Sequence, residues 1–432
     1  MKNFSEQEVD SIMKKEMDVF EKKGLLVDPF ARALEMRPLM VKDGKFLVSD
    51  FTGSSQLKDI RVRTDSYIDK DLFEKDRQVK LLYRSKIWIK PLDKRERIVL
   101  GLPPLDLSDL EALEELTRDD KNFDLNLCFG PVEQLLQYNL PFAFQSLGCN
   151  LHGPIDLLGC YFCFVDRFNN VPELSQGRGA WVDEQNIVNT YEAARSDPDW
   201  IRKNNLEWVA ERGGLNHIRH SGGQTTSHLD LTLRIANELK KRGLPVKLMY
   251  DTNLSTANAI RYWIDEGTYP KNILQQLGKN KVCLLTAFKG TDDTSIQYST
   301  QSTLNLEQQF DELAMHVDAG EFCYPYVYNG NPYKLNELVD QGMDRFENFL
   351  PMLHLATIGM YGPTEEHMRL RARIVGENEQ AYVAFQKELM EFLHAKSAEV
   401  INERCLKELD VLYRRTSRRE VVQELGGLRV KK

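Results

Sequence analysis

The sequence predicts an α/β protein whose central part is built from parallel strand–helix units. Six apolar strand candidates alternate with helical segments between residues 142 and 359. Strands that alternate with helices in this way are typical of parallel βαβ units. Connections between parallel strands are right-handed, so the units are expected to wind into a barrel or a doubly wound sheet.

The predicted strands are short and rich in apolar, β-branched and aromatic residues, at 142–149, 215–223, 246–253, 282–288, 322–329 and 352–359. Helices are predicted between them at 184–195, 229–242, 256–266, 306–318 and 335–349, and the one at 229–242 is amphipathic.

The segments on either side have different patterns. An amphipathic helix is predicted over residues 1–24, and alternating strand-like stretches follow at 45–51, 60–64 and 79–90. Two short helices are predicted at 105–118 and 131–138, and the chain after Gly376 is helical to about Arg419. We therefore divide the chain into an N-terminal α+β unit (1–130), a central parallel unit (131–365) and a C-terminal helical extension (366–432).

Composition narrows the function classes. The chain has 432 residues and a net charge of −8, which argues against a dominant nucleic-acid surface. A locally basic stretch at 58–97 could contact RNA or a phosphorylated substrate. The more common interpretation of such a stretch is a charged face exposed to solvent. No apolar run reaches the ~18 residues that a membrane span needs, and the first 24 residues lack the pattern of a signal peptide. A cytoplasmic protein without a membrane partner is expected.

Three of the seven cysteines lie close together. Ten residues separate Cys149 from Cys160, and two separate Cys160 from Cys163. Thiolates suit iron–sulfur clusters or zinc. Three of them leave one iron of a 4Fe–4S cluster open, whereas a structural zinc site needs a fourth ligand, for which His152 is available.

The stretch SLGCNLHGPIDLLGCYFCFVD (146–166) resembles the cluster loop of radical S-adenosylmethionine (SAM) enzymes. That family typically carries CxxxCxxC after the first strand of its barrel, and here seven extra residues lie between the first two cysteines. The resemblance implies a partial (β/α)6 TIM-type barrel, with a 4Fe–4S cluster on Cys149, Cys160 and Cys163. It also implies that Phe162 packs near the adenine of SAM. Without the resemblance, the more common interpretation of this residue is an aromatic side chain of the core.

A second match follows the second predicted strand. Gly222, Gly223, Gln224 and Thr225 stand where the family has a GGEP-like turn that binds the methionine amino group of SAM. Adjacent glycines let a backbone approach a ligand closely. Gln224 replaces the usual glutamate, and its amide oxygen can accept a hydrogen bond but brings no charge.

Later strand ends supply the remaining expected contacts. Asp251 and Asn253 follow the third strand, where they face a ligand or cap the helix that starts near Thr256. By resemblance, Thr286 and Lys289 of the fourth strand approach the ribose or the carboxylate of SAM.

The resemblance implies that the cluster cleaves SAM reductively to a 5′-deoxyadenosyl radical, which takes hydrogen from a substrate. That substrate is left open as a small molecule, a peptide or RNA. An electron donor such as flavodoxin or ferredoxin is expected, and the C-terminal helices are suited either to cap the open side of the barrel or to build a homodimer. The alternatives are a zinc-dependent β/α-barrel enzyme and a metal-stabilised binding protein that use the same cysteines.

Overall fold

The computed structural model describes the chain over the ranges 2–49, 65–68, 80–84, 87–91, 142–146, 149–151, 157–163, 165, 179–195, 217–220, 223–244, 246–328, 330–356, 360, 362–413 and 427–432. The helices predicted at 105–118 and 131–138 and the strand predicted at 60–64 lie outside these ranges. Among the described residues, no helix is both long and apolar enough to cross a membrane.

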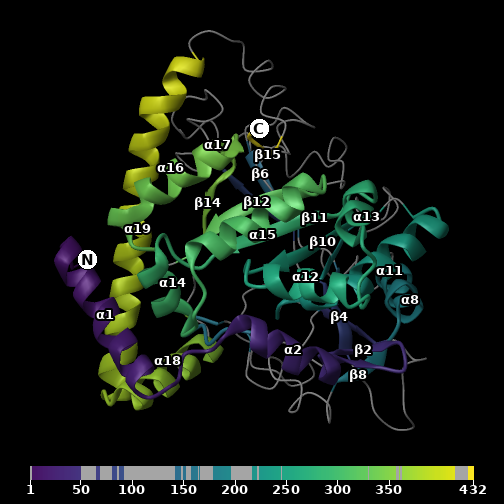
Figure 1. The fold of residues 1–432 in the computed structure, drawn as a ribbon, viewed down its shortest axis with the longest axis horizontal. Helices are drawn as coiled ribbons and strands as arrows, with labels where there is room; N and C mark the ends of the chain where they lie inside the picture. Colours follow the sequence, from purple (N-terminus) through teal and green to yellow (C-terminus); the bar gives the residue numbers. More distant parts are fainter. Residues whose placement is uncertain are drawn as a thin grey trace.

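A parallel sheet forms the centre of the fold (Figure 1). Its parallel strands follow one another in chain order: β7 (Cys149–Leu151), β9 (His217–His220), β10 (Lys247–Thr252), β11 (Cys283–Phe288), β12 (Phe322–Val327) and β14 (His354–Leu355). Two antiparallel strands extend the sheet beyond β7: β4 (Lys80–Arg84) and β3 (Asp65–Ile68). The prediction of an α/β fold with a parallel sheet is confirmed, and all carboxyl ends of the parallel strands lie at one edge.

Five helices between these strands were predicted: α8 (Glu184–Arg195), α11 (Leu229–Lys241), α12 (Ala257–Asp265), α15 (Leu306–Asp318) and α16 (Leu335–Arg345). Three further helices were not predicted: α13 (Ile273–Lys279), α14 (Asp293–Thr300) and α17 (Phe349–Met352). Helix α15 has the predicted bounds because Asn305 caps it, accepting a hydrogen bond from the Gln308 N–H at 2.9 Å. Its buried face carries Phe310 and Leu313, which pack into the core.

The predicted first strand is wrong. Residues Phe142–Ser146 form β6, which pairs antiparallel with β5 (Ile87–Pro91) in a separate two-stranded sheet. The first parallel strand is β7, and Cys149 begins it instead of ending it. The apolar composition of 142–146 indicates a strand correctly but carries no information about its partner, and three residues are too few for β7 to show alternation.

The terminal segments pack around this sheet. They form α1 (Glu6–Lys22), α2 (Pro29–Met40), α18 (Gly362–Val375), α19 (Glu379–Tyr413) and the paired strands β1 (Val41–Lys42) and β2 (Lys45–Val48). Strand β2 also pairs with β8 (Ala180–Val182), from the central part of the chain. At the C-terminus β15 (Arg429–Val430) pairs with β13 (Phe346–Glu347). Figure 1 shows α1, α18 and α19 together on one side of the molecule. The division at residues 130 and 365 stays a prediction.

Candidate functional site

The second half of the cysteine loop lies at the carboxyl edge of the parallel sheet. The Phe162 ring stacks on the Tyr328 ring, with centroids 6.3 Å apart and planes 16° apart. The Lys289 ammonium lies 4.9 Å from the Tyr328 centroid and 5.5 Å from that of Phe162. Lys289 directly follows β11 and Tyr328 directly follows β12. Ligand sites of α/β proteins are built at this edge.

Two of the three predicted thiolate ligands share one turn of this loop. The Cys163 N–H donates to the Cys160 carbonyl at 3.2 Å, and Cys160 is buried while Cys163 is half-buried. The structure describes Cys149 through its backbone in β7, and His152 lies outside the described ranges. Within those ranges no group of three or more potential ligands is assembled. The complete ligand set therefore stays a prediction, and the two soft donors in one turn fit it.

One glycine of the turn after β9 has a left-handed backbone conformation. Gly223 has φ = +64°, a region that favours glycine, and Gly222 lies outside the described residues. Thr225 begins the short 3-10 turn η4 (Thr225–His228) and is fully buried. Its hydroxyl donates to the Asp251 carbonyl, so the turn is tied to the end of β10.

Gln224 is fully buried and uses its amide within the protein. Its Oε1 accepts from the Asn253 N–H at 3.1 Å, and its Nε2 donates to the Thr252 hydroxyl at 2.7 Å. A glutamine can do both, whereas a glutamate would only accept. The side chain therefore joins the glycine turn to β10. Its contact with a ligand stays a prediction.

Asp251 and Asn253 lie at the end of β10. Arg219 of β9 forms two parallel hydrogen bonds to the Asp251 carboxylate, at 2.6 and 3.0 Å, and both side chains are 21% exposed. The Asn253 amide oxygen accepts from the Ser255 hydroxyl. The N–H of Thr256, at the start of α12, donates to Glu312. Arg219 was not predicted as a site residue. An arginine inside a short strand nevertheless indicates that an acidic side chain lies close by to pair with it.

Thr286 is buried, and its hydroxyl donates to the Tyr324 carbonyl at 2.9 Å. Two residues later Phe288 packs on Phe310 of α15, with ring centroids 5.1 Å apart. Side chains alternate along a strand, so Thr286 faces the helix layer and Lys289 faces the opposite side. The ligand contact of Thr286 stays a prediction, and Lys289 is the residue that reaches the cysteine loop.

A buried acid–base group lies beneath the end of β10, and sequence reasoning missed it. Glu312 of α15 is fully buried, and its Oε1 accepts from the Thr252 hydroxyl at 2.6 Å. One helical turn further, His316 Nδ1 hydrogen-bonds Glu321 at 2.9 Å. Burial raises the pKa of Glu312. The sequence pattern could have indicated this buried group, because Glu312 and His316 lie on the same helical face as the apolar residues that are buried.

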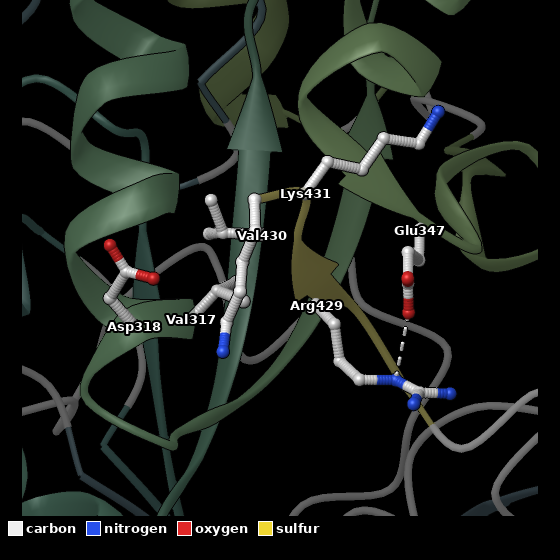
Figure 2. A pocket seen from close by; sticks show the side chains of 7 residues that line it. Val317, Asp318, Glu347, Arg429, Val430 and Lys431 are labelled. Atoms are coloured by element: carbon white, nitrogen blue, oxygen red, sulfur yellow. Dashed lines mark ion pairs between the residues drawn. The ribbon is translucent and has the colours of Figure 1, made fainter.

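A separate pocket lies near the C-terminus (Figure 2). It is lined by the end of α15, the strand β13 and the last residues of the chain: Val317, Asp318, Glu347, Arg429, Val430, Lys431 and Lys432. Arg429 and Glu347 form an ion pair at 3.3 Å. Asp318 ends the helix that leads into β12, so this pocket lies at the amino edge of the sheet, away from the cysteine loop.

Two groups of predicted residues thus meet the same carboxyl edge. Phe162, in the turn that carries Cys160 and Cys163, contacts the residues that follow β11 and β12. The turn at Gly223–Thr225 is bonded to Asp251 at the end of β10. No protein-family model matches the chain, and no curated protein matches it in sequence.

Proposed function

We propose that this chain is a radical SAM enzyme with a partial (β/α)6 barrel. The observation that carries the proposal is the position of Phe162, which lies between the two cysteines of one turn and stacks on Tyr328 at the carboxyl edge of β12. Two thiols are thereby held beside the edge at which barrel enzymes bind their ligands.

The order of the strands supports the barrel over the doubly wound alternative. In a doubly wound sheet the strand order reverses at a switch point, as in the order 3-2-1-4-5-6. Here the order β7, β9, β10, β11, β12, β14 has no reversal, and each neighbouring pair is parallel. Right-handed connections of one sense then put the linking helices on one side, which is the arrangement of a barrel.

Cys149, Cys160 and Cys163 would hold the cluster. When bound, a 4Fe–4S cluster would supply the electron for reductive cleavage of SAM and thus for abstraction of hydrogen from a substrate. A flavodoxin- or ferredoxin-type donor is part of the proposal, and the substrate is not assigned.

The chain's own residues would bind and orient the ligand. Phe162 and Tyr328 present stacked rings suited to a flat heterocycle and exclude water from the loop. Lys289 has no acidic partner among the described side chains, so its ammonium is available to a ligand carboxylate. Gly223 keeps the turn beside β10 free of a side chain.

The test is cleavage of SAM under anaerobic conditions. The chain is reconstituted with iron and sulfide, SAM and dithionite are added, and nucleoside products are analysed by mass spectrometry. We expect 5′-deoxyadenosine from the parent and none from the single Cys→Ala variants at Cys149, Cys160 and Cys163. Cys283→Ala and Cys323→Ala are matched controls, because these buried cysteines lie on β11 and β12 outside the loop and should leave cleavage intact.

The opposite result has a defined meaning. A colourless protein that holds zinc and leaves SAM intact would overturn the proposal. It would favour the zinc site with His152 as the fourth ligand.

A further inference from the structure

Helix α18, which crosses the predicted boundary at residue 365, contacts the second half of the cysteine loop through one face. The Thr364 hydroxyl donates to the Cys163 carbonyl at 3.3 Å, and His367 Nε2 hydrogen-bonds the Val165 carbonyl at 3.1 Å. The Arg371 guanidinium lies over the Tyr161 ring, 4.6 Å from its centroid. Residues spaced by three and four positions share a helical face, so these contacts act together.

Arg371 is itself held by an ion pair with the N-terminal helix. Its Nε donates to Glu16 of α1 at 2.7 Å, and the two residues are 2% and 6% exposed. The Tyr382 hydroxyl of α19 donates to the same carboxylate at 2.9 Å. Burial alone would lower the pKa of Arg371, but Glu16 and nearby tyrosines raise it, so the guanidinium stays charged.

The guanidinium is packed between aromatic rings. Its centre lies 4.7 Å from the Phe20 centroid and 4.6 Å from that of Tyr298, in addition to Tyr161. Among the described groups, neither Nη1 nor Nη2 has a hydrogen-bond partner. The guanidinium is therefore held by the aromatic rings and by the Glu16 carboxylate. A planar guanidinium can stack between rings, which the ammonium of a lysine cannot do.

Burying the charge of Arg371 costs desolvation free energy, which an apolar core residue would not lose. Replacing a buried ion pair by apolar side chains is often neutral or stabilising, whereas removing one partner is strongly destabilising. A charged Arg371 beside Tyr161, the residue between Cys160 and Phe162, is therefore better explained by a requirement for one loop geometry than by stability.

We infer that Arg371 is a positioning residue for the cysteine loop, and that Glu16 makes its position depend on helix α1. Through Tyr161 and the two carbonyl contacts of α18, the pair fixes the turn that carries Cys160 and Cys163. The terminal helices then complete the metal-binding segment instead of only covering the sheet. The inference rests on the proposed function in treating this loop as the functional one.

The test measures thiol reactivity in the full-length chain under anaerobic conditions, with the metal removed by a chelator. Iodoacetamide alkylation of each cysteine is followed by peptide mass spectrometry. We expect Arg371→Met and Glu16→Gln to speed alkylation of Cys160 and Cys163 about tenfold, as when one charged hydrogen bond no longer opposes local opening. Arg371→Lys should restore part of the protection.

Internal controls separate a local effect from unfolding. Cys283 and Cys323 are buried in the sheet, so their alkylation should stay slow in every folded variant. Arg373→Met is the matched control on the same helix, because the Arg373 side chain is 61% exposed and pairs with Glu379. It should behave like the parent.

Unchanged reactivity of Cys160 and Cys163 in folded Arg371→Met overturns the inference. If that variant unfolds, so that the control thiols of Cys283 and Cys323 also react quickly, the same measurement on Glu16→Gln and Thr364→Val decides instead. The failure of this inference can be told apart from the failure of the proposed function. If the parent holds no iron–sulfur cluster but the variants are alkylated faster, the proposed function is refuted and the positioning role is supported. If the parent forms a cluster but the variants show no change in thiol reactivity, the proposed function is supported and the positioning role is refuted.

Discussion

Glu312 of helix α15 accepts a hydrogen bond from the hydroxyl of Thr252, the last residue of strand β10, at 2.6 Å. Its other oxygen accepts from the N–H and the hydroxyl of Thr256. The carboxylate is fully buried, so these donors replace its hydration. Glu312 thereby ties the helix layer to the strand end that also holds Gln224 and Asn253.

Changing Glu312 to Gln should destabilise the chain by about 1–3 kcal/mol, because either orientation of the amide turns an NH2 group towards a donor. The measurement is the unfolding midpoint in denaturant at neutral pH. Glu307→Gln on the same helix is the control, since that side chain is 69% exposed and its pair with Arg345 should contribute little. Equal midpoints for both variants would contradict the role given to Glu312.

His316 should make stability depend on pH. Burial lowers the pKa of His316, but Glu321 and Glu312 outweigh it and raise the pKa above its ordinary value of 6.5. The buried groups around it also include the Tyr250 hydroxyl and the Cys323 thiol. A raised pKa in the folded state means that the stabilisation is complete below the unfolded pKa and is lost as pH rises through the folded pKa.

The change His316→Asn should therefore lower stability most at acidic pH, by about 3 kcal/mol near pH 6, and less near pH 9. Thermal unfolding of parent and variant across this range measures the difference. A difference that stays constant with pH would show that the pKa of His316 is the same in the folded and unfolded states, and would contradict this prediction.

Gly223 and Gly243 offer a matched pair. Both have positive φ, +64° and +65°, so alanine should cost each about 1–2 kcal/mol of stability. Gly223 lies at the turn beside β10, whereas Gly243 follows α11 and has open space where a Cβ would lie. Calorimetric titration with SAM should show weaker binding in Gly223→Ala alone. Parallel losses of stability with unchanged binding in both would speak against a ligand at the glycine turn.

Lys289→Met should weaken SAM binding about tenfold, because it would remove the proposed charge-assisted contact to a carboxylate and leave an apolar side chain beside Phe162 and Tyr328. The dissociation constant of the reconstituted chain is the readout. Lys279→Met, at an exposed position at the end of α13, should not change it. An unaltered constant in Lys289→Met would exclude this lysine from ligand recognition.

Much of the fold was predictable from local patterns. The bounds of α15 and the strand β11 were recovered almost residue by residue, because helical and extended periodicity and the Asn305 cap are properties of neighbouring residues. The partner of a strand is not a local property. For that reason 142–146 was recognised as extended but assigned to the wrong sheet, and β7 was missed.

The α/β class follows from the sequence alone, and so does the prediction of a metal-binding role for Cys149, Cys160 and Cys163, because periodicity and thiolate spacing are properties of short segments. Tertiary structure alone decided that Gln224 joins two strand ends, that Thr286 faces the helices, and that Arg371 meets Glu16 across 355 residues. Buried polar groups are satisfied by whatever donors and acceptors the folded chain brings to them, and contacts at such separations leave no periodic trace in the sequence.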